Sequence, residues 1–186
     1  MDALVLPSRV VELLRRAAEE GGVSLEDFLM DVAAARLDPP ERARAYAEAA
    51  LELLREAEAE LARGDLRQAS EEVWGTAALA VKAFAYWRDG VRLASHGELW
   101  RYAEKVAEEL GEWVRDAWAH ANAMHVNFYE GWASGEQVAA ALNRVRRLVE
   151  AVAGRVLSRG KRGFLFRIFL AISLCLGVPF FAFSAR

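Results

Sequence analysis

The alternation of apolar and polar positions predicts α-helices through the centre of the chain. Between Tyr46 and Leu61, apolar residues recur every three to four positions, and a longer apolar stripe runs from Leu66 to Trp87. This spacing places the apolar side chains on one face of a helix. Because only a short loop at Gly64 separates the two stripes, we expect two antiparallel helices that pack through these faces. We interpret the stripes as core rather than as a cofactor site.

Capping residues mark the boundaries of five helices. Short polar side chains accept hydrogen bonds from the first turn of a helix, and a glycine commonly follows the last turn. The signals are Asp38 and Gly64 for the first helix, Asp65 and Gly90 for the second, Ser95 and Gly111 for the third, and Ser134 with Gln137 for the start of the fifth, which reaches about Leu157. The fourth helix is expected from Glu112 to Glu130. The sequence therefore predicts an all-α protein, with an antiparallel bundle of four to five helices over residues 39–158.

Residues 1–38 form a predicted N-terminal appendage. A short apolar stretch ends at Pro7, a helix begins at Ser8, and a second short helix begins at Ser24. This strand–helix–helix order resembles the ribbon-helix-helix unit of small repressors and antitoxins, in which polar side chains of the strand contact bases. Here Asp2 is the only polar residue of the strand that could do so. We therefore expect a role in oligomerisation or packing rather than in reading DNA.

Residues 159–186 form a basic linker followed by an apolar tail. Between residues 164 and 183 the only charged side chain is Arg167, and an apolar stretch of about 20 residues is long enough to cross a bilayer. The basic residues before it fit the cytoplasmic side of a membrane. We expect a cytoplasmic protein whose tail could tether it to the inner face of the cell membrane. The alternatives are a helix packed on the bundle or on a partner, and an altered reading frame at the end of the gene.

Charge and composition restrict the classes of partner. The chain has a net charge of −3 and is 54% hydrophobic, so it is neither a disordered chain nor one with a global positive field for nucleic acid. Between Asn143 and Arg162, however, seven basic residues stand against one acid. Arg144 and Arg147 in this segment are candidate contacts to RNA, DNA or anionic lipid, and the alternative is a solvated helix face. The single cysteine permits no intramolecular disulfide, and no metal, nucleotide or Gly-rich phosphate motif predicts a cofactor.

Three segments carry a resemblance to a known family. Residues 56–90, "EAEAELARGDLRQASEEVWGTAALAVKAFAYWRDG", resemble the opening helical hairpin of HEPN domains. The segments "HGELWRYAEKVAEELG" and "AMHVNFYEGW" resemble the archaeal PaREP family, a HEPN-related group, and the whole resemblance covers residues 41–157. It implies an all-α, dimeric bundle of no known activity. The wider superfamily includes metal-independent ribonucleases, toxins of toxin–antitoxin pairs and inert binding domains.

The same resemblance implies a candidate catalytic pair. HEPN ribonucleases carry an arginine followed four to six residues later by a histidine, and Arg115 and His120 fit this form. In such a site the histidine acts as general base or acid on the RNA, and the arginine stabilises phosphate charge. The spacing by itself is expected by chance in a chain with this many arginines. Only its position, near the start of the fourth helix, gives it weight.

Helix geometry divides the fourth helix into two faces. At about 100° per residue, His125 falls on the apolar face, where we expect a hydrogen-bonded core or boundary histidine. The opposite face has Arg115, Asn122 and Tyr129 along one edge, Asp116, His120 and Asn127 along the other, and Ala119 and Ala123 between them. Asp116 is one turn from His120 and would orient it and raise its pKa. The small alanines would let a second copy approach, so this face is a candidate dimer surface.

These observations lead to one leading hypothesis and two alternatives. The protein is predicted to be a non-catalytic binding or regulatory module, a homodimer that associates with RNA or with an antitoxin-like protein. Its predicted binding residues are Asp116, Asn122, Asn127, Tyr129, Arg144 and Arg147. The first alternative is a metal-independent endoribonuclease that uses Arg115 and His120. The second is a scaffold tethered to the membrane by residues 164–183.

Overall fold

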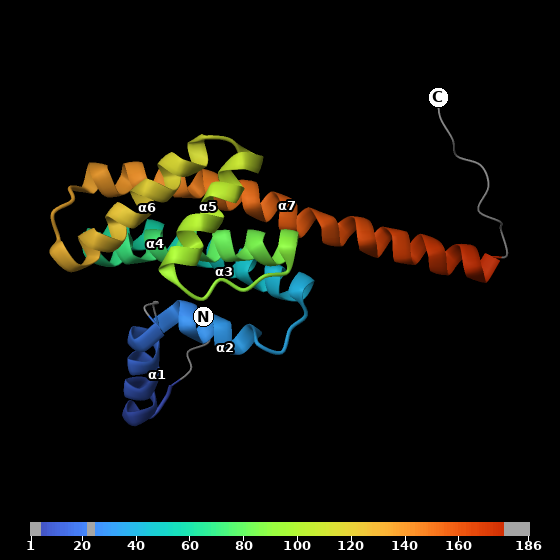
Figure 1. Cartoon of the computed structure of the whole chain (residues 1–186), viewed down its shortest axis with the longest axis horizontal. Helices are drawn as coiled ribbons and strands as arrows, with labels where there is room; N and C mark the ends of the chain where they lie inside the picture. The colour runs from blue at the N-terminus through green and yellow to red at the C-terminus, as the bar shows by residue number, and fades with distance from the viewer. Residues whose placement is uncertain (1–4, 22–24, 177–186) are drawn as a thin grey trace.

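The computed structural model describes residues 5–21 and 25–176, with the backbone alone for residues 26–27 and 159–176. This part of the chain contains seven α-helices and no strand (Figure 1). The helices are α1 (Ser8–Gly21), α2 (Leu25–Ala34), α3 (Pro39–Arg63), α4 (Leu66–Asp89), α5 (His96–Leu110), α6 (Trp113–Glu130) and α7 (Gly135–Leu176). The predicted all-α class is confirmed, and α3 to α7 form the bundle.

The hairpin of α3 and α4 has the boundaries that the sequence predicts. The Asp38 carboxylate accepts a hydrogen bond from the Glu41 backbone N–H at 2.8 Å, and Gly64 ends α3 in the left-handed conformation with φ of 82°. Both features satisfy backbone groups that a helix end leaves without partners. At Gly75 the two helices approach so closely that an added Cβ would lie 2.9 Å from the Leu53 side chain. Glycine at this position therefore permits the close packing of α3 against α4.

Helix α4 is the central helix of the bundle. It packs against α3, α5, α6 and α7, so the segment from Ala77 to Tyr86 is buried on every side. A helix that is covered all round differs from a surface helix, whose apolar stripe faces one neighbour only. Residues of α4 therefore contact residues of α3, α5, α6 and α7, and α4 fixes the positions of these helices around it.

Helix α7 is longer than the sequence predicts. It continues past Leu157 to Leu176, because no proline follows Gly135 until Pro179 and the isolated glycines before it are compatible with a helix. Figure 1 shows its C-terminal part projecting beyond the bundle. No helix in the described residues is both long and apolar enough to cross a membrane. Of the predicted anchor, the side chains of residues 164–176 and the whole of 177–183 lie outside the described residues.

The N-terminal appendage consists of the two predicted helices. Residues 5–7, the described part of the predicted strand, are not in a strand, and residues 1–4 lie outside the description. The Asp31 carboxylate of α2 ties the appendage to the bundle, since it accepts hydrogen bonds from the Tyr46 hydroxyl and from Arg92 at 2.9 Å. Asp31 also lies 3.6 Å from the ammonium group of Lys82, which is 1% exposed. A buried cation needs such a counter-charge, so α2 completes the bundle at this point.

Candidate functional site

Helix α6 has one buried face and one open face. Val114, Ala117, Trp118, Ala121 and Met124 are buried, and α6 packs on α4, α5 and α7. The opposite side, which we call the outer face of α6, consists of Arg115, Ala119, Asn122, Ala123 and Val126, all exposed or half-buried. The predicted division of this helix therefore holds along most of its length.

The two predicted catalytic residues have different partners. Arg115 donates a hydrogen bond to Glu104 at 2.6 Å and another to Glu112. These two carboxylates, Glu112 first, raise the pKa of the guanidinium above its usual value. His120 makes its contacts on the other edge of the helix. Within one chain, the arginine and the histidine therefore belong to separate groups of side chains.

His120, Asp116 and Arg144 form one connected group. The His120 Nδ1 atom lies 3.3 Å from an Asp116 carboxylate oxygen and 2.8 Å from the Asp116 carbonyl oxygen. Arg144 donates from Nε to the second carboxylate oxygen at 2.8 Å. Asp116 thus links α6 to α7 and fixes the orientation of the imidazole, whose side chain remains 37% exposed. Three of the predicted site residues meet here.

The two asparagines of the prediction have structural contacts. Asn127 is 0% exposed, donates to the Ser70 hydroxyl at 2.9 Å and accepts from the Ala133 N–H at 2.6 Å. Its predicted place on the polar edge is therefore wrong, because the chain turns at Gly131 and covers it. Asn122 donates to the Trp118 carbonyl at 2.8 Å and stays at the surface, half-buried.

Arginines of the basic segment are engaged with other helices. The Arg147 guanidinium lies 4.1 Å from the centre of the Trp113 ring, a cation–π contact. Arg146 pairs with Glu58 at 3.0 Å, and Arg155 pairs with Glu109 at 3.1 Å. Together with the pair of Arg144 and Asp116, these contacts hold α7 to the bundle. A nucleic acid would have to compete with them.

A second histidine group lies on the inner side of α6, and sequence reasoning found only His125 of it. His125 Nδ1 lies 3.1 Å from a carboxylate oxygen of Glu71 on α4. The His96 ring stacks on Trp74 with centroids 4.6 Å apart, and the His125 ring lies 5.4 Å from His96. Two of the three histidines in the chain therefore meet here. The available signal was a pair of adjacent glutamates, at 71 and 72, in a helix that is otherwise a long apolar stripe.

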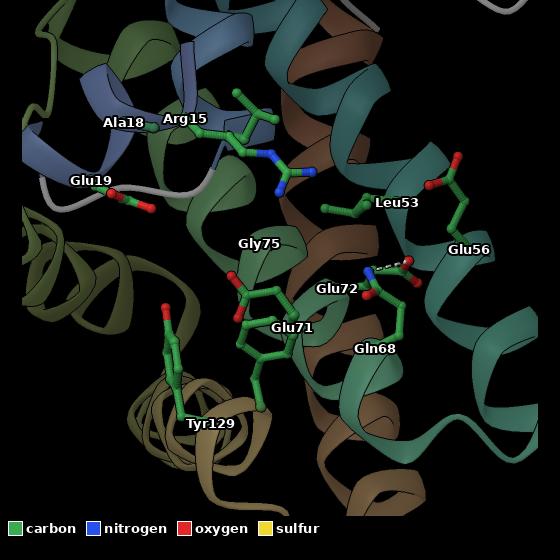
Figure 2. Close-up of a pocket in the computed structure, with 12 residues that line it drawn as sticks. Arg15, Ala18, Glu19, Leu53, Glu56, Gln68, Glu71, Glu72, Gly75 and Tyr129 are labelled. Carbon is green, nitrogen blue, oxygen red and sulfur yellow. Dashed lines mark hydrogen bonds between the residues drawn. The ribbon is translucent and has the colours of Figure 1, made fainter. Parts of the chain in front are cut away.

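Tyr129 joins this inner group to a cavity. Its ring packs edge-on against His125 at 5.4 Å, and its hydroxyl has a raised pKa because the side chain is partly desolvated. The cavity has a volume of about 360 Å³ and lies between α1, α3, α4 and the end of α6 (Figure 2). Carboxylates dominate its polar lining, which includes Glu19, Glu56, Glu71 and Glu72 against one cation, Arg15.

Glu72 is the most buried of these carboxylates. Its exposed fraction is 9%, and burial raises its pKa to about 7. Gln68 donates to one of its oxygens at 3.2 Å. The other oxygen is buried and has no hydrogen-bond partner among the described residues. A buried oxygen without a donor is costly, so this atom is the most unusual feature of the cavity.

Comparisons with known proteins identify the family. No curated protein and no solved structure matches the chain. The model of the archaeal PaREP1/PaREP8 family matches residues 45–149, which include both histidine groups and more than half of the chain. This match confirms the predicted PaREP resemblance. The chain belongs to the archaeal PaREP1/PaREP8 family.

Proposed function

We propose that the protein is a non-catalytic binding module that acts as a homodimer through the outer faces of α6. The observation that carries the proposal is the way in which the charged side chains of this helix are held within their own chain. Arg115 is occupied by Glu104 and Glu112. Asp116 is occupied by His120 and Arg144. These contacts leave the small and apolar side chains at the centre of the outer face as its open surface.

The shape of this surface supports a second copy as the occupant. Ala119 and Ala123 lie one turn apart, and their short side chains permit two helix axes to approach closely. Val126, one turn further, is 46% exposed. A single self-complementary ridge of this kind suits a two-fold axis, in which the same patch is used by both copies. The HEPN resemblance of residues 56–90 also implies a dimeric bundle.

Aromatic side chains near α6 supply the anchors that protein interfaces commonly use. Trp100 on α5 is 44% exposed and packs edge-on against Trp118, and Trp132, just after α6, is 48% exposed. The arginines of α7 support a protein partner in preference to RNA, since each of the four described above already has a partner. We therefore propose an antitoxin-like protein, ahead of RNA, as any further partner of the dimer.

Sedimentation equilibrium of matched variants tests the proposed dimer. Val126→Glu introduces two buried, repelling carboxylates at the interface, and we expect a dissociation constant roughly tenfold higher or more. The control is Val91→Glu, because Val91 is 40% exposed and belongs to the loop between α4 and α5 rather than to α6. A wild-type chain that sediments as a monomer, or equal effects of the two variants, would contradict the proposal.

A metal-independent endoribonuclease is the second candidate, and the contact between Asp116 and His120 favours it. A carboxylate that orients an exposed imidazole is a common arrangement in general acid–base catalysis. Within one chain Arg115 belongs to another group, so the pair would have to be completed across the two-fold axis. The same dimer could thus hold an Arg115 of one copy near the His120 of the other.

RNA incubated with the protein and excess chelator separates the two candidates. A ribonuclease would cleave the RNA, and His120→Ala would abolish the cleavage while the helical circular dichroism stays unchanged. The binding module predicts no cleavage by either protein. Arg44→Ala, at an exposed position on α3, is the control for a lost positive charge and should leave any cleavage unchanged.

A further inference from the structure

The N-terminal appendage has few buried side chains. Helix α1 packs on α2, and α2 packs on α3 and α4; Figure 1 shows α1 and α2 together at one side of the bundle. Among the described side chains of residues 5–37, only Ala18 and Ala34 are buried. The cavity of about 360 Å³ separates α1 from the bundle. A segment with so few buried contacts opens at a lower free-energy cost than the whole protein unfolds.

Asp31 on α2 makes the strongest polar contacts between the appendage and the bundle. Its carboxylate accepts hydrogen bonds from the Tyr46 hydroxyl of α3 and, at 2.9 Å, from Arg92 in the loop between α4 and α5. The ammonium group of Lys82 on α4 lies 3.6 Å from the same carboxylate, whose side chain is 13% exposed. Donors from three elements of the bundle, two of them cations, therefore surround one carboxylate of the appendage.

The residues that follow α2 are held to the bundle separately. Arg42 of α3 donates to the carbonyl oxygens of Ala35 at 2.8 Å and Leu37 at 2.9 Å. The link between α2 and α3 can therefore stay on the bundle when α2 leaves it. Because α1 packs on α2, the two helices would move as one unit about the start of this link.

The donors and the carboxylate belong to different parts of the chain. The family match begins at residue 45 and includes the three donors, whereas Asp31 lies before it. The bundle thus carries the buried ammonium group of Lys82, and the appendage adds an anion to it. A buried cation is stabilised by a nearby anion, and hydrogen bonds from cations to a carboxylate are among the strongest in proteins. The geometry therefore fits a carboxylate, whichever molecule carries it.

We propose that Tyr46, Lys82 and Arg92 form a carboxylate-binding site of the bundle, that Asp31 occupies it as a built-in ligand, and that opening of the appendage makes it available to a carboxylate of another molecule. Asp31 enters the site from the surface of a helix, so an acidic side chain on a helix of a partner can enter in the same way. A small free carboxylate has the same chemistry, and the experiments below distinguish the two sources. The site does not include the outer face of α6, so its test is independent of the proposed dimer.

Rescue of Asp31→Ala by acetate tests the site. The full-length variant lacks the built-in carboxylate, so we expect sodium acetate to raise its thermal midpoint in a saturable way, whereas acetamide and sodium chloride at the same concentrations do not. Arg92→Gln in the same background should weaken acetate binding roughly tenfold. Arg101→Gln, at an exposed position on α5, should leave it unchanged. A folded Asp31→Ala protein that acetate stabilises no more than chloride does would overturn the proposal.

Hydrogen exchange of the wild-type chain tests the opening, and it does not depend on whether Asp31→Ala folds. The probe is a synthetic peptide of residues 25–37, and the control is the same peptide with Asp31→Asn. A ligand that binds only the opened form increases its population by mass action. We therefore expect the peptide to speed deuterium uptake by the α1 amides roughly threefold or more and to leave the α4 amides unchanged.

The same measurement identifies the source of the carboxylate. Faster uptake with the peptide alone would support an acidic side chain on a partner helix, and faster uptake with acetate as well would support a small free carboxylate. No increase with either probe would overturn the proposal. An equal increase with the Asp31→Asn peptide would also overturn it, because the carboxylate would then not be the group that the bundle binds.

Discussion

Helix α6 carries one histidine–carboxylate pair on each side, and the two pairs differ in everything except their chemistry. His120 lies 3.3 Å from Asp116 of the same helix, and the pair is exposed to solvent. His125 lies 3.1 Å from Glu71 of another helix and is surrounded by Trp74, His96 and Tyr129. The outer pair is local and open, whereas the inner pair depends on the assembled bundle.

The comparison shows that residue type alone does not identify a site. The segment from Arg115 to Glu130 looks like one dense group of polar residues in the sequence. In the fold it divides into an outer face that we propose for dimerisation and an inner side that holds α6 to α4. If this division is right, substitutions on the inner side should lower stability, and matched substitutions on the outer side should leave stability almost unchanged.

The largest contrast is expected between the two asparagines of α6. Asn127→Ala leaves the Ala133 N–H without its acceptor in a fully buried place and removes the donor to the Ser70 hydroxyl, which keeps its own bond to the Leu66 carbonyl. We expect the free energy of unfolding to fall by about 2–4 kcal/mol. Asn122→Ala removes only a bond to the Trp118 carbonyl of its own helix, and we expect a loss of less than about 1 kcal/mol. Urea unfolding measures both values.

Equal losses from the two asparagine variants would break the comparison. If both losses were large, the outer face would contribute to the stability of the monomer. If both were small, the bonds of Asn127 to Ser70 and Ala133 would not hold the end of α6. The helical circular dichroism of each variant shows whether the measurement starts from a folded protein.

The next effect concerns pH and the buried Glu72 beside the inner pair. Its pKa is raised from 4.5 to about 7 by burial first, and Glu60 and Glu56 add to the rise while Arg63 opposes it. The folded state therefore binds the Glu72 proton more tightly than the unfolded state, so the contribution of Glu72 to stability is highest below about pH 4.5 and is lost as the pH rises through about 7. Glu72→Gln should remove at most about 3 kcal/mol of this fall between pH 5 and pH 8.

Urea unfolding at pH 5 and pH 8 measures that difference. The control is Glu48→Gln, which removes one exposed carboxylate on α3. It leaves every charged residue of the cavity in place, including Arg15 and Glu19 of α1. A Glu72→Gln protein whose stability falls between the two pH values as much as that of the wild type would show that Glu72 does not titrate in this range.

The smallest contrast is expected between the two histidines. His125→Ala removes the bond to Glu71 and the ring contacts with Trp74 and Tyr129, and we expect a loss of about 1–2 kcal/mol. His120→Ala removes an exposed pair within one helix, which contributes no more than about 0.5 kcal/mol. Thermal unfolding followed at pH 7 compares the two. A larger loss of stability from His120→Ala than from His125→Ala would contradict the comparison, because the outer pair would then stabilise the fold more than the inner pair.

The helix boundaries could be predicted because their signals are local. Asp38 with Glu41, the turn at Gly64 and Asp65, and the cap at Ser95 act within a few residues of the helix end that they define. The end of α7 could not be predicted in the same way. No stop signal stands at Leu157, because the first proline after it is Pro179, and the helix continues to Leu176.

The candidate sites were predictable only where they lie within one helix. The contact of Asp116 with His120 follows from their spacing of four residues. Glu71 and His125 are 54 residues apart in the chain, so only the packing of α6 on α4 brings them together. Asn127 was misplaced for the same reason, because a helical projection does not show that Ala133 returns to cover it.

Disulfide cross-linking at the centre of the outer face tests the central claim most directly. In a Cys175→Ser background, Ala123→Cys places one thiol on the ridge, and two α6 helices that cross there would bring the paired residues within disulfide distance, a Cα–Cα separation of about 4–7 Å. We predict that mild oxidation converts Ala123→Cys to a covalent dimer and leaves Val91→Cys monomeric. A chain that cross-links equally at both positions, or at neither, would contradict the assignment of the outer face of α6 as the dimer interface.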